Sequence, residues 1–225
     1  MTKVVFLTAD HAMGQARDRG MLRDNQRWAA QVAAHSRADP AASGEEYWHH
    51  HVTGRYRSAA SIRRAIVEGY TAAATIAAPD GWIVALMGHG SDAMCDVGPA
   101  PHFRVNMDVV RAANNFAGSA GFETEAEALL NLRRAVGGRV SELRFATCNM
   151  ARGTGTSFLR SLGAVIQVES RPTLYGLDGF LWSQDEGRSV AMGVIDSRGG
   201  SPARLYRTEL WRQRWYPQRT GSGAP

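Results

Sequence analysis

The chain has 225 residues, of which 44% are hydrophobic and 21% charged, with a formal net charge of +5 at pH 7. This length suits one sizeable domain, and the composition excludes a disordered chain. The sequence shows no apolar run long enough to cross a bilayer and no secretory signal in MTKVVFLTADHAM. We therefore expect a soluble, cytoplasmic protein without a membrane partner, in which Cys95 and Cys148 are thiols.

The positive charge comes almost entirely from arginine, because Lys3 is the only lysine. Arginines alternate with tyrosines and tryptophans near the end of the chain, at residues 203–219. Such a segment can bind nucleic acid through phosphates and stacking. We favour the alternative that its rings pack on the core while the arginines face water. We therefore do not expect a nucleic-acid partner, and we predict one domain at residues 1–210 with a basic, flexible tail at 211–225.

The first half of the chain predicts a strand, a helix, an irregular segment and a second helix. Residues 3–10 (KVVFLTAD) have the short β-branched and aromatic run of a buried strand. Residues 21–34 have apolar side chains at helical spacing. Residues 34–57 are polar and irregular, which predicts a long loop or a small excursion with a role in function or mobility. Helical spacing returns in residues 58–77.

Strands and helices alternate in the second half. Residues 81–90 (GWIVALMGHG) are typical of a central strand covered on both faces, and residues 122–136 predict a helix that two glycines end. The other expected elements are a strand at 143–147, a helix at 155–163 closed by Gly163, a strand at 164–170, and later strands at 189–196 and 203–211 that form an antiparallel edge pair. This alternation implies βαβ crossovers. We predict an α/β fold with three α/β/α layers and a mostly parallel sheet.

Two of the apolar strands end at reactive side chains, His89 in IVALMGHGS and Cys148 in LRFATCNMARGTG. Ligand sites of open parallel sheets lie beyond the carboxyl ends of the strands. Adjacent strands are only about 5 Å apart, so both side chains emerge at the same rim if these strands are neighbours. The helix expected at residues 122–136 supplies the crossover between them.

A thiol beside an imidazole is the minimum apparatus for acyl transfer, because the imidazole promotes the thiolate and later protonates the leaving amine. The amide of Gly90 and that of Cys148 could hold the oxyanion. We also expect the helix that begins a few residues after Cys148 to lower the pKa of its thiol.

This arrangement resembles the caspase-like cysteine peptidases, which include caspases, metacaspases, gingipains, separases and CHAT domains. The likeness lies in IVALMGHG, an apolar strand followed by His-Gly, and in LRFATC, an apolar strand followed by a small residue and Cys. The segment CNMARGTGTSFLRSLGAVIQV is also similar to the CHAT pattern, and the coverage is about residues 1–195. The resemblance implies a caspase-like sheet and a peptidase with His89 as acid/base, Cys148 as nucleophile and Gly90 in the oxyanion hole.

The substrate specificity of these families does not carry over. Ala146 stands two residues before the nucleophile, where caspases have a glutamine and metacaspases an aspartate that help to recognise the P1 side chain. The expected topology puts two pairs of residues, each at the carboxyl end of a strand, where they line an S1 pocket: Asp10 with His11, and Glu169 with Ser170. An acid among them would favour a basic P1 residue.

Simpler interpretations of the same residues remain open. Cys148 alone is typical of a small buried hydrophobe, and His89 of a satisfied core histidine. A catalytically dead relative would keep most of the pattern. GTGTSF, with Gly153 and Gly155, has features of a phosphate-binding loop, but it has no Gly-Lys-Ser/Thr and follows a late strand.

The remaining histidines and the second cysteine give no metal site. His49 to His51 would point alternately to opposite faces of an extended segment, so they cannot all bind one ion, and we assign them to a surface loop. A zinc site at Cys95 would lack a fourth ligand. We therefore regard Cys95 as incidental, or as the second-choice nucleophile.

The sequence thus predicts a bacterial, caspase-like cysteine endopeptidase that cleaves a protein or peptide substrate without a metal or another cofactor. We further expect a protein partner or a cleavage event to activate it. Residues 34–57 and 95–107 are the segments expected to move. The alternative is a non-catalytic pseudo-peptidase that binds nucleic acid or protein through its Arg/aromatic C-terminal surface.

Overall fold

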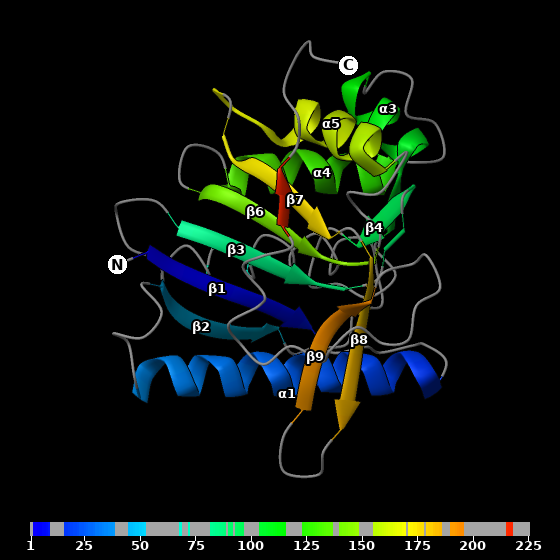
Figure 1. The fold of residues 1–225 in the computed structure, drawn as a ribbon. Coiled ribbons are helices and arrows are strands. Elements are labelled where there is room, and N and C mark those ends of the chain that lie inside the picture. The colour runs from blue at the N-terminus through cyan, green and yellow to red at the C-terminus, as the bar shows by residue number, and fades with distance from the viewer. Residues whose placement is uncertain are drawn as a thin grey trace, which may run out of the picture.

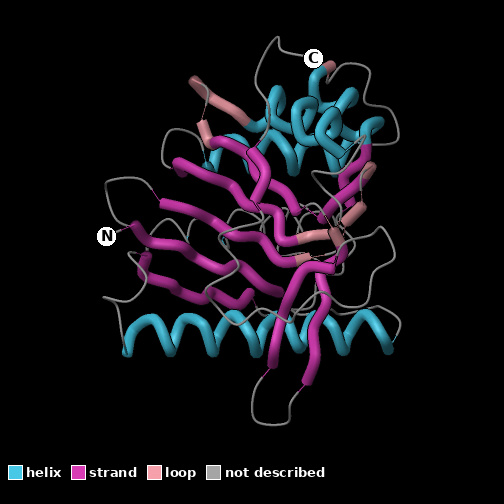
Figure 2. Tube along the Cα trace, viewed as in Figure 1, coloured by secondary structure: helices cyan, strands magenta, loops and turns pink. Residues whose placement is uncertain are grey.

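The structure is a computed structural model that describes residues 2–9, 16–38, 45–52, 68, 72, 82–88, 90–91, 93–96, 104–115, 123–136, 140–148, 155–169, 171–177, 179–185, 190–195 and 215–217. Its centre is a six-stranded sheet in the order β10-β7-β6-β3-β1-β2 (Figures 1 and 2). The strands are β1 (Thr2–Ala9), β2 (Glu45–Val52), β3 (Trp82–Met87), β6 (Val140–Ala146), β7 (Thr173–Leu177) and β10 (Trp215–Pro217). The first five run parallel, and β10 is antiparallel to β7. The predicted α/β class is confirmed.

Helices cover both faces of this sheet (Figure 1). One face packs on α1 (Ala16–Ala38) and on a hairpin of β8 (Phe180–Asp185) and β9 (Val190–Ile195). The other face packs on α3 (Met107–Asn114), α4 (Glu123–Val136) and α5 (Gly155–Ile166). Among the described helices, none combines the length with the apolar character that crossing a bilayer requires.

The alternation of side chains along β1 shows why the sheet is buried on both sides. Val4 and Phe6 pack in the α1-side core with Trp28, whose ring meets Phe6 edge-on at 5.3 Å between centroids. Val5 and Leu7 pack in the opposite core. Because successive side chains of a strand point to opposite faces, an uninterrupted apolar run suits this position.

Strand β2 corrects the expectation of an irregular segment at residues 34–57. Helix α1 extends to Ala38, and Glu45–Val52 forms a strand parallel to β1. Tyr47 anchors the strand, because its ring stacks on Phe6 with 5.6 Å between centroids and 9° between planes. The three histidines in EEYWHHHV obscured the β pattern, since they count as polar in a hydropathy reading although they sit on a paired strand.

Helix α5 corrects the predicted strand at residues 164–170. The helix runs through Gly163 to Ile166, and β7 begins only at Thr173. Phe158, Leu162 and Val165 are buried at helical spacing on both sides of that glycine. Packing of this apolar face therefore carries the helix past a residue that the sequence suggested as its end.

The C-terminal expectations are only partly within the described residues. Trp215–Pro217, in the segment expected to be a flexible tail, forms β10 at the edge of the sheet. The strand expected at 203–211 lies outside the described residues, as does the helix expected at 58–77 except for residues 68 and 72. Strand β9 matches the strand predicted at 189–196 and pairs with β8.

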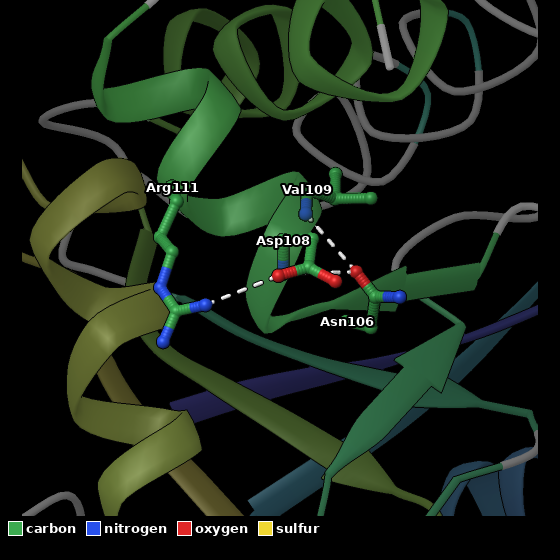
Figure 3. Close-up of polar contacts among 4 residues, drawn as sticks. All are labelled: Asn106, Asp108, Val109 and Arg111. Atoms are coloured by element: carbon green, nitrogen blue, oxygen red, sulfur yellow. Dashed lines mark hydrogen bonds and ion pairs between the residues drawn. The ribbon is translucent and has the colours of Figure 1, made fainter. Parts of the chain in front are cut away.

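A short antiparallel pair, β4 (Met94–Asp96) and β5 (Arg104–Asn106), occupies both ends of the segment expected to move at residues 95–107. Strand β5 leads directly into α3, whose N-cap is Asn106 (Figure 3). The Asn106 side-chain oxygen accepts hydrogen bonds from the backbone N–H of Asp108 and of Val109, both at 3.0 Å. Asp108 also pairs with Arg111 at 3.1 Å.

We predict that Asn106→Ala lowers the free energy of unfolding by about 1 kcal/mol, because two helix N–H groups lose their acceptor. Asn114→Ala is the matched control, since Asn114 is exposed in the last turn of the same helix; its effect should stay within about 0.5 kcal/mol. Urea denaturation measures both. Equal losses in the two variants would contradict the capping role.

Candidate functional site

The strands that lead to His89 and to Cys148 are direct neighbours. Strands β3 and β6 pair in parallel, with Met87 opposite Ala146 at their carboxyl ends. The backbone N–H of Gly88 also reaches the carbonyl of Ala146 at 3.5 Å. The predicted adjacency of these two strands is confirmed. His89 itself lies outside the described residues, so its distance from Cys148 stays a prediction.

Gly90, the residue after His89, packs directly on Thr147, the residue before Cys148. A Cβ atom added to Gly90 would lie 2.6 Å from Thr147 Oγ1 and 2.7 Å from Thr147 Cβ, so a larger residue does not fit. A bridge from Gly90 to Cys95 and a 2.8 Å hydrogen bond from Ser91 N–H to the Met94 carbonyl turn the chain back into β4. The segment after β3 is therefore held against the end of β6.

Cys148 is half-buried and packs against the α1-side core. Its Sγ accepts a hydrogen bond of 3.3 Å from the backbone N–H of Leu181 in β8. Burial raises the pKa of the Cys148 thiol above its ordinary value, and the Leu181 N–H lowers this pKa only in part. The expectation of a lowered pKa is therefore wrong for the described surroundings: desolvation dominates, and α5 begins only at Gly155.

Cys95 is less accessible to solvent than Cys148. It lies in β4, fully buried in the core with α3, α4 and α5. A buried thiol surrounded by apolar side chains is a poor nucleophile, because its charged form is desolvated. Of the two cysteines, Cys148 is the one that solvent can reach.

Of the residues expected at the P1-recognition position or in an S1 pocket, the structure describes Ala146 and Glu169, and these two lie at opposite ends of the sheet. Ala146 ends β6 and is fully buried. The prediction that Glu169 lies at the carboxyl end of a strand is wrong. Glu169 lies in a tight turn between α5 and β7, with φ of 52°. Since β7 runs parallel to β6, Glu169 lies at the amino end of the sheet, opposite the end that carries Cys148. Asp10, His11 and Ser170 lie outside the described residues.

Thr8 of β1 forms a polar cluster with His49 and His51 of β2, which was not predicted from the sequence. Thr8 Oγ1 lies 2.8 Å from His49 Nε2 and 2.8 Å from His51 Nδ1. These side chains follow Phe6 and Tyr47 on the α1-side face, on which Cys148 also packs. Burial, followed by the charges of His51 and His50, lowers the pKa of His49 to about 4. The signal in the sequence was the His-X-His spacing, which a strand turns toward one face.

The described residues contain no group of three or more His, Cys, Asp or Glu side chains that could hold a metal ion. In comparisons with known proteins, no family model, no curated protein and no solved structure matches this chain.

We predict that Gly90→Ala lowers the free energy of unfolding by about 1 to 3 kcal/mol, because its methyl group would overlap Thr147. The test is a double-mutant cycle with Thr147→Gly, followed by urea denaturation. In the Thr147→Gly background, the added methyl should cost at least about 1 kcal/mol less than in the wild type. Strictly additive effects would contradict a direct contact between the two residues.

Proposed function

We propose that this protein is a cysteine endopeptidase of the caspase-like kind, in which Cys148 attacks the peptide bond and His89 acts as acid and base. The pairing of β3 with β6 supports the proposal most strongly. Met87 and Ala146 are opposite each other in this pairing, and His89 and Cys148 each follow two residues later.

The contact between Gly90 and Thr147 adds independent support. These residues are the chain neighbours of His89 and of Cys148, and they approach so closely that only glycine fits. Gly90 follows His89 directly and Thr147 directly precedes Cys148. The contact therefore joins the residues next to the two proposed catalytic residues. Two parallel strands that end at one level, with the next segments still touching, suit a two-residue catalytic site.

The proposed reaction uses these groups in two stages. His89 accepts the thiol proton, Cys148 Sγ forms a bond to the carbonyl carbon, and the C–N bond breaks as His89 passes the proton to the leaving amine. Water then attacks the thioester, gives a proton to His89, and releases the acid and the thiolate, which recovers that proton. The Gly90 and Cys148 amides are proposed to hold the oxyanion in both stages.

Burial makes the reaction depend on a cation beside the sulfur. Since burial raises the pKa of Cys148, the thiol alone is nearly all protonated at neutral pH. The Leu181 N–H supports the thiolate with one hydrogen bond. The imidazolium of His89 is proposed to supply the remaining stabilisation as an ion pair, so that losing His89 removes both the base and the thiolate.

The finer parts of the proposal concern fold and context. Helices on both faces and the parallel strand order fit a three-layer, caspase-like domain. We also propose a cytoplasmic protein with a peptide or protein substrate, which a protein partner or cleavage activates. The pairing of β10 with β7 gives part of the Arg/aromatic segment a structural role, which weighs against nucleic-acid binding there.

The direct test incubates the wild type and Cys148→Ala with peptides that differ at P1. We expect cleavage of at least one peptide class by the wild type and none by Cys148→Ala or His89→Ala. His50→Ala is the matched control for the loss of a histidine, because His50 lies on β2, and it should retain activity. Cleavage that survives in Cys148→Ala would overturn the assignment of the nucleophile.

A second prediction concerns the pH dependence of alkylation by iodoacetamide. At pH 7 the wild type should react at Cys148 about tenfold or more faster than His89→Ala, because the thiolate fraction falls tenfold per pH unit below the pKa. In His89→Ala the rate should keep rising beyond the ordinary pKa of a thiol, since burial raises the pKa of Cys148. Cys148→Ala measures the background from buried Cys95. Superimposable pH profiles for the wild type and His89→Ala would contradict the dyad.

A further inference from the structure

Strand β2 is at the edge of the sheet, and two of its histidines converge on one atom of the neighbouring strand. His51 is the register partner of Thr8, and His49 lies diagonally across from it, opposite Phe6. Both imidazoles are partly exposed, whereas Thr8 is buried. From this convergence we propose that His49 and His51 form a binding site for a divalent transition-metal ion such as zinc.

The distances allow one ion to reach both rings. His49 Nε2 and His51 Nδ1 are no more than twice 2.8 Å apart, because each lies 2.8 Å from Thr8 Oγ1. An ion with Zn–N bonds of about 2.0 to 2.1 Å needs the nitrogens within about 4 Å. The ring centroids are 6.2 Å apart, with a tilt of 45°. Ion binding therefore requires the two side chains to rotate until their nitrogens are within about 4 Å, and to release their hydrogen bonds to Thr8 Oγ1.

The hydrogen bonds explain how the site is arranged before an ion binds. A threonine hydroxyl has one proton, so Thr8 donates to one imidazole and accepts from the N–H of the other. The nitrogen that accepts from the hydroxyl already has its lone pair directed toward Thr8 Oγ1, and an ion would take over that lone pair. The other becomes a ligand when its proton moves to the second nitrogen of the same ring, which leaves the imidazole neutral.

The site has two protein ligands and not three. His50 lies between them but points to the opposite face, with Trp48, which packs against the other core. Water molecules would have to supply the remaining ligands of a four-coordinate ion. Strands β1 and β3 separate β2 from β6, so this site is distinct from the Cys148 site.

Calorimetric titration with Zn²⁺ tests the proposal, on the full chain in a Cys148→Ala background so that the thiol adds no zinc site. His49→Gln and His51→Gln should each weaken binding by about tenfold or more. His50→Gln is the matched control and should leave the Kd within about twofold, because that ring faces away. Equal weakening by all three variants, or by none, would overturn the site.

A measurement on the unmutated imidazoles covers the case in which a variant fails to fold. With one equivalent of Cu²⁺ in the same background, we expect an electron paramagnetic resonance spectrum with hyperfine splitting from two nitrogens, which the His50→Gln control preserves. A spectrum without nitrogen ligation would overturn the proposal. Neither readout depends on peptidase activity, so this site and the proposed dyad can fail separately.

Discussion

The parallel pairing of β3 with β6 is the constraint on which the remainder of the molecule depends. Strand β3 is apolar along its whole length and β6 is buried from Leu143 to Ala146, because helices or the β8–β9 hairpin cover each face of the sheet. The pairing brings chain segments far apart in the sequence to one rim, and the fit of Gly90 against Thr147 continues this contact beyond the strands. A close contact between backbone and side chain at this point leaves little freedom for the two ends.

Burial of Cys148 has opposing consequences for the proposed chemistry. A partly desolvated sulfur lies in a defined position, packed against the α1-side core and bonded to the Leu181 N–H. The same desolvation raises the pKa of the thiol, which removes the reactive thiolate unless a cation approaches. In the proposed dyad, one imidazolium therefore has to offset the burial that the hairpin imposes.

The parts of the fold that could be predicted from the sequence are those where local pattern and tertiary packing agree. Strands β1, β3 and β6 follow from their apolar runs, and α4 from its spacing and closing glycines. Packing overrode local signals elsewhere: α5 continues through Gly163, and β2 pairs with β1 despite its histidines. Of the site, the shared rim could be predicted, whereas the position of Glu169 and the Thr8–His49–His51 cluster depend on register, which no single segment encodes.

The distance between a ring nitrogen of His89 and Cys148 Sγ, measured in a crystal structure of the reduced protein, tests the central claim most directly. The account predicts that one ring nitrogen lies within about 4 Å of the sulfur, close enough to exchange a proton. A separation of about two strand spacings, ~10 Å or more, would contradict it.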